Sequence, residues 1–201
     1  MAQQLLLTGE QGIKVVVLDI QPLSFEAPPE VHYFECDITS PAEIAAVAKE
    51  VRLKVGHPSI LINNAGVARG KNLLVASERN IRFTFDVNTF AQFWTVREFL
   101  PDMIAHNHGM VVTVASFAAW VTVPDMVDYA ASKAAAYAFH EGLTAELKTR
   151  YNAPKVRLRS KGANIMPNFR GRQVVTDLDK FYADREKSDT EESTVLVPEA
   201  K

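Results

Sequence analysis

Short apolar runs alternate with longer amphipathic stretches along most of this chain. The runs are rich in β-branched residues and are bounded by turn-forming residues, which is typical of buried strands in a parallel sheet. We expect such strands at residues 14–20, 31–34, 59–62 and 110–115. The stretches between them predict helices at residues 40–55, 77–107 and 129–150. This alternation predicts an α/β domain with a doubly wound parallel sheet.

The first predicted helix carries clear signals at both ends. Ser40 is suited to cap it, Pro41 fits the first helical position, and Glu43 completes a capping box. Gly56 is expected to end it. In the long helix that follows, Pro101 is expected to cause a bend or an interruption.

Composition narrows the class of protein. The chain has 201 residues, of which 47% are hydrophobic and 23% charged, with a net charge of -2, so we expect one soluble globular domain without general attraction to nucleic acid or anionic membranes. The single cysteine, Cys36, excludes an internal disulfide and a multi-cysteine zinc site, which is consistent with a reducing compartment. We recognise no signal peptide or membrane span, and we therefore expect a cytoplasmic chain. We also expect no metal site.

Polar residues follow the predicted strands where each strand ends. Asp19 ends the first strand, and an acidic residue at this position in a dinucleotide fold binds the adenosine ribose and repels a 2′-phosphate. The alternative is that Asp19 only caps the loop that follows the strand. The segment Asn63–Gly66 would let a cofactor approach the backbone, although an ordinary turn uses similar residues. Ser116 ends the fourth strand, at the edge where open α/β sheets bind ligands.

Tyr129 and Lys133 lie one turn apart in the last predicted helix. An ammonium group near a phenol favours the phenolate and lowers the pKa of the tyrosine, so the pair is a candidate for proton transfer. The same spacing recurs at Tyr151 and Lys155, where Pro154 makes a regular helix unfavourable. Only Tyr129 also has a serine at a strand end, Ser116, 13 residues before it.

Several motifs in this chain occur in an order that resembles the short-chain dehydrogenase/reductase family. They are Asn63-Asn-Ala-Gly66, Asn88, Ser116 and Tyr129-x-x-x-Lys133. The sequences of residues 106–116 and 128–133 are similar to those of the retinol and 17β-hydroxysteroid dehydrogenase branch of this family. The resemblance covers Lys14 to Arg157, and it implies a Rossmann-like fold and an oxidoreductase of lipid or retinoid metabolism that transfers hydride between a nicotinamide cofactor and an alcohol or ketone.

The resemblance implies four catalytic residues. Tyr129 would be the general acid/base, and Ser116 would hydrogen-bond the reacting oxygen and stabilise its developing charge. Lys133 would lower the pKa of Tyr129 and bind the nicotinamide ribose. Asn88 would hold a water that links Lys133 to solvent, although a lone asparagine in a helix is more often a satisfied structural group.

The resemblance also implies a cofactor site. Asn63, Ala65 and Gly66 would lie along the cofactor, together with Tyr129 and Lys133, while Asp37 and Ile38 would frame the adenine. As a ribose ligand, Asp19 would favour NAD over NADP. The apolar side chains of Phe117, Trp120, Val123 and Met126 indicate a hydrophobic substrate such as a retinoid or steroid, with ordinary loop packing as the alternative.

Both ends of the chain depart from the family pattern. Family members begin with a central strand, a glycine-rich turn and a helix that bind the pyrophosphate. Here residues 8–13 leave too little chain for that crossover, so we expect the first strand, the turn and thus the main phosphate site to be missing. Cofactor binding would then be weakened or lost. Beyond a partial dehydrogenase domain at residues 1–157, residues 158–201 are expected to form a divergent, poorly ordered tail.

Two functions remain open from the sequence. One is a working dehydrogenase, which in this family is usually a homodimer formed by the helices at residues 77–107 and 129–150. The other is a truncated, non-catalytic protein that acts through pairing of those helices. Relatives often carry a membrane anchor, so a location at the endoplasmic reticulum or lipid droplets is an expectation for full-length relatives.

Overall fold

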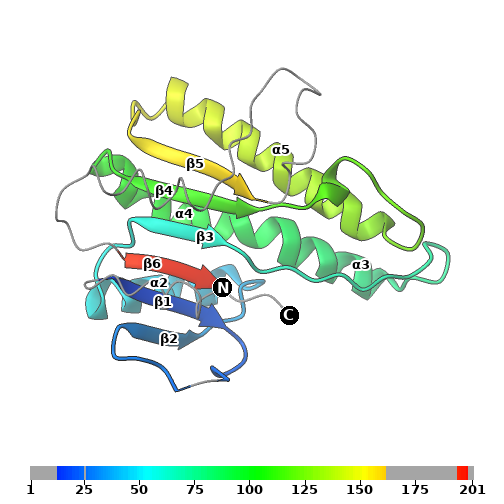
Figure 1. The fold of residues 1–201 in the computed structure, drawn as a ribbon, viewed down its shortest axis with the longest axis horizontal. Coiled ribbons are helices and arrows are strands. Elements are labelled where there is room, and N and C mark those ends of the chain that lie inside the picture. The colour runs from blue at the N-terminus through cyan, green and yellow to red at the C-terminus, as the bar shows by residue number, and fades with distance from the viewer. Residues whose placement is uncertain (1–12, 25, 162–193, 199–201) are drawn as a thin grey trace.

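The computed structural model describes residues 13–24, 26–161 and 194–198, which form a parallel sheet with helices packed against it (Figure 1). The sheet has six strands in the order β2-β1-β6-β3-β4-β5. All of its strand pairs are parallel. The strands are β1 (Lys14–Asp19), β2 (Val31–Glu35), β3 (Ile60–Asn63), β4 (Gly109–Val114), β5 (Val156–Lys161) and β6 (Thr194–Pro198). The first four lie within one or two residues of the ranges predicted from the apolar runs.

The last strand that the structure describes, β6, lies in the middle of the sheet, between β1 and β3. β6 pairs with β1 from Thr194 to Pro198 and with β3 at Val195 and Leu196, so it occupies the position that we expected to be empty. A gap there would leave backbone N–H and C=O groups of β1 and β3 unpaired inside the sheet, which is costly. Residues 1–12, which include most of the segment that we judged too short for the crossover, lie outside the described residues.

The expected boundary at residue 157 falls inside a strand. β5 continues to Lys161 and pairs with β4 along its whole length. β6 belongs to the segment that we expected to be a poorly ordered tail, but it is part of the sheet. The rest of residues 158–201 lies outside the described residues.

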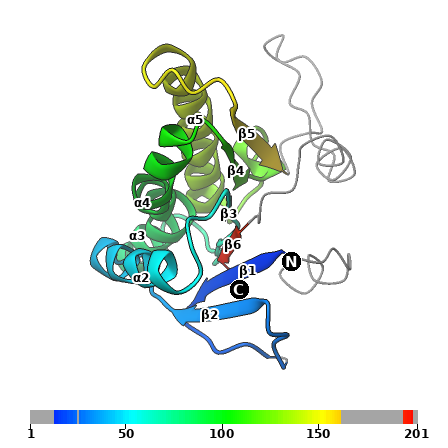
Figure 2. The ribbon, with the colours of Figure 1, turned by 90° about the vertical axis from the view of Figure 1, so that its left-hand side faces the viewer.

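The described helices lie together on one face of the sheet (Figure 2). They are α2 (Pro41–Lys54), α3 (Glu78–Phe85), the π-helix η1 (Asp86–Phe90), α4 (Ala91–Ala105) and α5 (Val127–Thr149). The short 3₁₀-helix η2 (Phe117–Ala119) follows β4 at the end of the sheet. Ser40 caps α2 as predicted and Gly56 follows its end with φ of 117°. The Glu43 carboxylate, however, accepts from the N–H of Asp37 and so ties the helix to the loop before it.

The long helix predicted at residues 77–107 is divided at a different place from the one expected. α4 runs continuously through Pro101, and the irregular turn is η1 at its N-terminal end. π-turns are rare and are frequent at functional sites. Here the turn carries Asn88, which was a candidate residue from the sequence.

The core lies between the sheet and this helical layer. Val16 and Leu18 of β1 pack there with Ile44 of α2 and with Phe99 and Met103 of α4. The alternate residues Val15 and Val17 are also fully buried, on the other face of β1. Burial on both faces explains why the strand reads as a continuous apolar run.

Candidate active site

The candidate catalytic residues come from three elements that meet at the carboxyl end of the sheet. Asn88 lies in η1, Ser116 follows β4, and Tyr129 and Lys133 lie in the first two turns of α5. α5 packs against both η1 and η2. The fold therefore brings together segments that are up to 45 residues apart in the chain.

Lys133 is a buried cation, with only 3% of its surface exposed. Its Nζ donates to the backbone oxygen of Val114 at 3.0 Å and lies 5.9 Å from the centre of the Tyr129 ring. Burial penalises the charged form and lowers the pKa of Lys133 to about 8. The amine can therefore gain or lose a proton near neutral pH far more readily than an exposed lysine.

Gly66 keeps the space beside this amine open. A Cβ atom at residue 66 would lie 3.2 Å from Nζ of Lys133 and 3.4 Å from Oδ1 of Asn88. Any larger side chain would crowd the amine. A side chain at residue 66 would therefore fit only if Lys133 or Asn88 moved by a few tenths of an ångström.

The side chain of Asn88 is fully buried and bound to protein groups. Its Oδ1 accepts from the N–H of Val67 at 2.8 Å, and its Nδ2 donates to the Val67 oxygen at 2.9 Å. Nδ2 also donates to Oγ of Ser132 at 2.9 Å. These contacts are those of a satisfied structural amide, the alternative that the sequence left open, and they tie the segment after β3 to α5.

Ser116 and Tyr129 lie on the two elements that Lys133 connects. Ser116 caps η2, with Oγ accepting from the N–H of Ala118 at 3.2 Å, and it follows the Lys133 acceptor Val114 by two residues. Tyr129 is half-buried in the first turn of α5. The Lys133–Val114 hydrogen bond therefore holds the end of β4 against the part of α5 that carries the phenol.

The second Tyr-x-x-x-Lys match is not part of this arrangement. Tyr151 lies beyond the end of α5, and its hydroxyl contacts the Glu146 carboxylate at 3.0 Å. That hydrogen bond is the largest cause of the raised pKa of Tyr151, which is the opposite of what a proton-transfer group needs. The backbone of Lys155 is held by Asn107.

The candidate nucleotide ligands lie on the other part of the sheet, and each caps its own turn. Oδ1 of Asp19 accepts from the N–H of Gln21 at 2.9 Å. Oδ1 of Asp37 accepts from both the N–H and the hydroxyl of Thr39, and Ile38 packs partly buried against the core. The loop-capping alternative for Asp19 is therefore present in the structure, although one carboxylate oxygen can cap while the other binds a ribose.

Asn63 ends β3 with one half of its amide satisfied. Its Oδ1 accepts from the hydroxyl of Thr95 in α4 at 2.7 Å, whereas Nδ2 is buried without a hydrogen-bond partner in the part of the chain that the structure describes. Asn64, Ala65 and Gly66 continue from it and remain partly exposed. This segment leads to Val67, where Asn88 binds.

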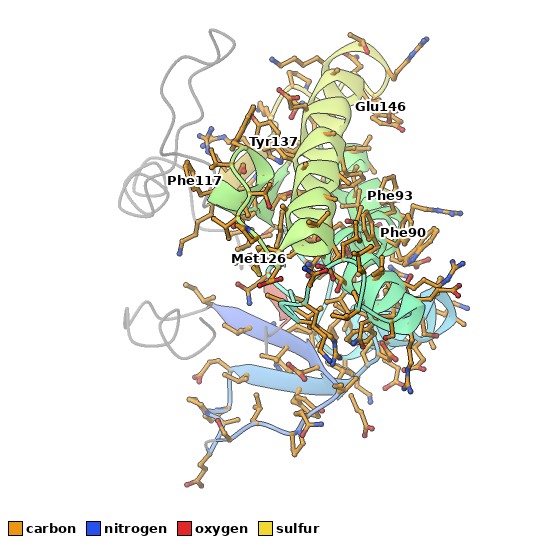
Figure 3. The ribbon with its side chains drawn as sticks, turned by 90° about the vertical axis from the view of Figure 1, so that its right-hand side faces the viewer. Phe90, Phe93, Phe117, Met126, Tyr137 and Glu146 are labelled. Atoms are coloured by element: carbon orange, nitrogen blue, oxygen red, sulfur yellow. The ribbon has the colours of Figure 1, made fainter. Side chains whose placement is uncertain are left out.

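The four candidate substrate residues form the connection from β4 to α5. Trp120 packs its ring edge-on against Tyr137, with ring centroids 4.8 Å apart, so its position owes much to packing. Val123 is exposed, and Met126 approaches Gly70 in the segment after β3. Figure 3 shows Phe117 beside Tyr137 on one side of α5 and Met126 at its N-terminal end.

Further polar residues around α5 were not singled out from the sequence. Ser132 and Thr89 are buried, and the Thr89 hydroxyl donates to the Ser132 oxygen at 2.9 Å. Thr84 of α3 donates to the Asp128 carboxylate at 3.1 Å, next to Tyr129 in the chain. Hydroxyl residues at apolar helical positions are the only sequence signal for them, and such residues are also common on exposed faces.

Comparison with known proteins defines the class. The family model for short chain dehydrogenase matches residues 4–158, so the chain belongs to that family. It is 50% identical over 153 residues to Dehydrogenase RED2 of Cochliobolus heterostrophus, covering 75% of this chain and 58% of the relative. It is also 46% identical over 118 residues to human Estradiol 17-beta-dehydrogenase 11, covering 59% and 39%. These relatives confirm the resemblance to the steroid and retinol dehydrogenase branch.

Solved structures agree with the fold. A metagenomic short-chain oxidoreductase in complex with NADP is 26% identical, has a TM-score of 0.64, and is matched over 84% of this chain and 74% of its own. Matching structures contain NADP in some cases and NADH in others, so they leave the choice of nucleotide open. This chain spans 58% of the length of Dehydrogenase RED2, 65% of that of Dehydrogenase RED3 and 39% of that of human Estradiol 17-beta-dehydrogenase 11.

Two further findings concern metal ions and membrane-spanning helices. In the part of the chain that the structure describes, no cluster of three or more histidine, cysteine or acidic side chains is arranged to hold a metal ion. None of the described helices is long and apolar enough to cross a membrane.

Proposed function

We propose that this chain transfers hydride between NAD(H) and a hydrophobic alcohol or ketone of the retinoid or steroid type. The observation that carries the proposal is the environment of Lys133. Its buried amine, with a pKa lowered to about 8, lies near the Tyr129 ring and is hydrogen-bonded to the end of β4. Few structural roles explain a desolvated lysine beside a half-buried tyrosine, whereas proton transfer does.

The residues around Lys133 fit the nicotinamide half of the proposed cofactor. Gly66 places no side-chain atom beside the amine, and Asn63 offers a buried side-chain N–H, on Nδ2, that has no hydrogen-bond partner among the described residues. When bound, the cofactor supplies the hydride acceptor or donor. The glycine-rich turn that binds pyrophosphate in other members has no counterpart in the described residues.

The chain's own residues would move the proton. Tyr129 would take the proton of an alcohol, or give one to a carbonyl oxygen, while the Ser116 hydroxyl hydrogen-bonds that oxygen. Lys133, whose Nζ lies 5.9 Å from the centre of the Tyr129 ring, would stabilise negative charge that develops on the phenol oxygen during the transfer. Asn88 would act by holding Val67 and Ser132, which its side chain binds. A water that links Lys133 to solvent would have to bind atoms of Asn88 that these hydrogen bonds do not use.

Specificity for NAD and for a lipophilic substrate is part of the same proposal. Asp19 ends β1 with a carboxylate that would repel a 2′-phosphate. Phe117 follows Ser116 in the chain and Met126 lies at the N-terminal end of α5, where they would contact an apolar substrate. The names of relatives such as Estradiol 17-beta-dehydrogenase 11 support a substrate of this class.

A binding and turnover experiment tests this function. Purified protein is titrated with NADH by fluorescence, and turnover is measured with a retinol and a steroid substrate. We expect saturable binding, and Tyr129→Phe should reduce turnover by at least about a thousandfold with little change in affinity, because the hydroxyl acts mainly in the transition state. Tyr151→Phe is the matched control and should keep full activity. No binding at millimolar NADH would refute the proposal, as would full activity of Tyr129→Phe.

A second candidate function is supported by exposed aromatic residues on the helices. Phe90 and Phe93 are 45% and 39% exposed, and the Phe93 ring lies 4.3 Å from that of Phe139 on α5. Figure 3 shows Phe90 and Phe93 on the side of α5 opposite Phe117. A non-catalytic chain could pair with a second copy through this surface, as could an active homodimer. Light scattering that finds a dimer in the wild type and a monomer in Phe93→Glu, without NADH binding in either, would favour the non-catalytic function.

A further inference from the structure

Ser132 lies between the two residues of the Tyr-x-x-x-Lys motif and is completely buried. Its hydroxyl donates to the backbone oxygen of Tyr129 at 2.7 Å and accepts from Nδ2 of Asn88 at 2.9 Å. The single side chain thus uses both its donor and an acceptor position, one toward each neighbour. A buried serine in a helix commonly makes the first kind of bond, whereas the bond from Asn88 comes from a different element.

The orientation of the Asn88 amide makes this contact specific. Val67 binds both ends of the amide, because its N–H reaches Oδ1 and its C=O accepts from Nδ2. A flipped amide would set donor against donor and acceptor against acceptor. The second proton of Nδ2 is therefore directed at Ser132, and without the hydroxyl it would be buried and unpaired.

Thr89 binds the same residue through the backbone. Its hydroxyl donates to the Ser132 carbonyl oxygen at 2.9 Å, so two consecutive residues of η1 contact Ser132. These bonds connect positions 43 and 44 residues apart in the chain. Ser132 is the point where the π-turn is fixed to the helix that carries the phenol and the amine.

We propose that Ser132 is a positioning residue for the proposed reaction. It connects the backbone of Tyr129, through Asn88, to Val67 in the segment proposed to lie along the cofactor. Removing the hydroxyl would let the amide of Asn88 and the Val67 segment shift relative to Tyr129 and Lys133. The assignment rests on the proposed function, and it adds a residue that acts only through others.

The test compares Ser132→Ala with Thr144→Val. The Thr144 hydroxyl also donates to a backbone oxygen in α5, that of His140 at 2.8 Å, but not to η1. Ser132→Ala should raise the Kd for NADH roughly tenfold and lower kcat roughly ten- to a hundredfold, since a displacement of about 1 Å at a reacting group can cost that much. Thr144→Val should lower only the melting temperature. A Ser132→Ala protein that is folded and has wild-type Kd and kcat would overturn the assignment.

Two further variants separate the possible failures. If Ser132→Ala does not fold, Thr89→Val removes one contact to Ser132 with little change of shape and should still raise Kd and lower kcat severalfold; wild-type values there would overturn the assignment. Tyr129→Phe reports on the proposed function itself. A Tyr129→Phe protein with full activity refutes that function and this assignment with it, whereas an inactive Tyr129→Phe beside an unaffected Ser132→Ala refutes only the role of Ser132.

Discussion

The two parts of the sheet edge hold their polar side chains in different ways. Around α5, Lys133 binds Val114 and Asn88 binds Val67 and Ser132, across 19 to 44 residues of chain. At the ends of β1 and β2, Asp19 and Asp37 bind groups only two residues further on. The first set requires the complete fold, whereas the second could form in an isolated turn.

This contrast indicates that the polar residues around α5 are held in fixed relative positions, whereas the two aspartates are held only within their own loops. Long-range hydrogen bonds between buried groups fix distances between elements, which proton transfer requires. Local caps fix only the path of one loop. We therefore expect substitutions near α5 to alter both stability and chemistry, and substitutions at the two aspartates to alter nucleotide choice with little effect on the fold.

Asn88→Ala is expected to give the largest effect. It would remove the partner of the N–H and C=O of Val67 and the donor to the Ser132 hydroxyl, and we expect a loss of about 3 kcal/mol in the free energy of unfolding. Asn72→Ala is the matched control, because the Asn72 side chain caps Leu74 locally in an exposed loop and should cost about 0.5 kcal/mol. Urea denaturation measures both. Equal losses would remove the distinction between long-range and local contacts.

His140 offers a pH-dependent test on the same side of the molecule. Its ring contacts the Thr113 hydroxyl at 3.2 Å, and burial lowers the pKa of His140 from 6.5 to about 4. The unfolded chain therefore binds a proton between pH 6.5 and 4 that the folded chain does not bind, so stability falls as the pH falls through this range. We expect the loss to be about 2 kcal/mol after allowing for the partial exposure of the ring.

The measurement compares the wild type with His140→Gln. Glutamine can still hydrogen-bond Thr113 but does not titrate, so the variant should lose less stability than the wild type between pH 7 and pH 4.5. Urea denaturation at both pH values gives the difference. Parallel losses in the two proteins would show that His140 stays accessible to protons in the folded state.

Much of this architecture could be predicted because its signals are local. The β-branched runs of β1 and β3 and the cap at Ser40 depend on neighbouring residues, and their bounds came out within one or two residues. β6 could not be predicted in the same way. Its pairing depends on a gap between β1 and β3, and the charged residues before it indicated a tail.

In the candidate site too, features with a local sequence signal could be predicted and features that depend on the fold could not. The spacing of Tyr129 and Lys133 on one helix is local, and the distance from Lys133 to the Tyr129 ring agrees with it. The partners of Asn88 are not visible in the sequence, because Val67 uses only its backbone and Ser132 lies 44 residues away. The π-turn that orients Asn88 has no residue signature in this sequence, so the irregularity in the helix was predicted at Pro101 and not at Asn88.

The smallest effect on the fold is expected from Asp19→Asn, which tests the local side of the comparison. The amide oxygen of asparagine can still accept from the N–H of Gln21, so the free energy of unfolding should change by less than about 0.5 kcal/mol. The loss of the negative charge should lower the ratio of affinity for NADH over NADPH by roughly tenfold, since repulsion of the 2′-phosphate is removed.

Asp37→Asn is the matched control for this change in nucleotide preference. Asp37 also caps a turn, by accepting from Thr39, but the family resemblance assigns it to the adenine and not to the ribose. Fluorescence titrations with NADH and NADPH should therefore show a changed ratio for Asp19→Asn and an unchanged ratio for Asp37→Asn. If both ratios stay at the wild-type value, Asp19 serves only as a cap for its own loop, and selectivity between the two nucleotides must come from other residues.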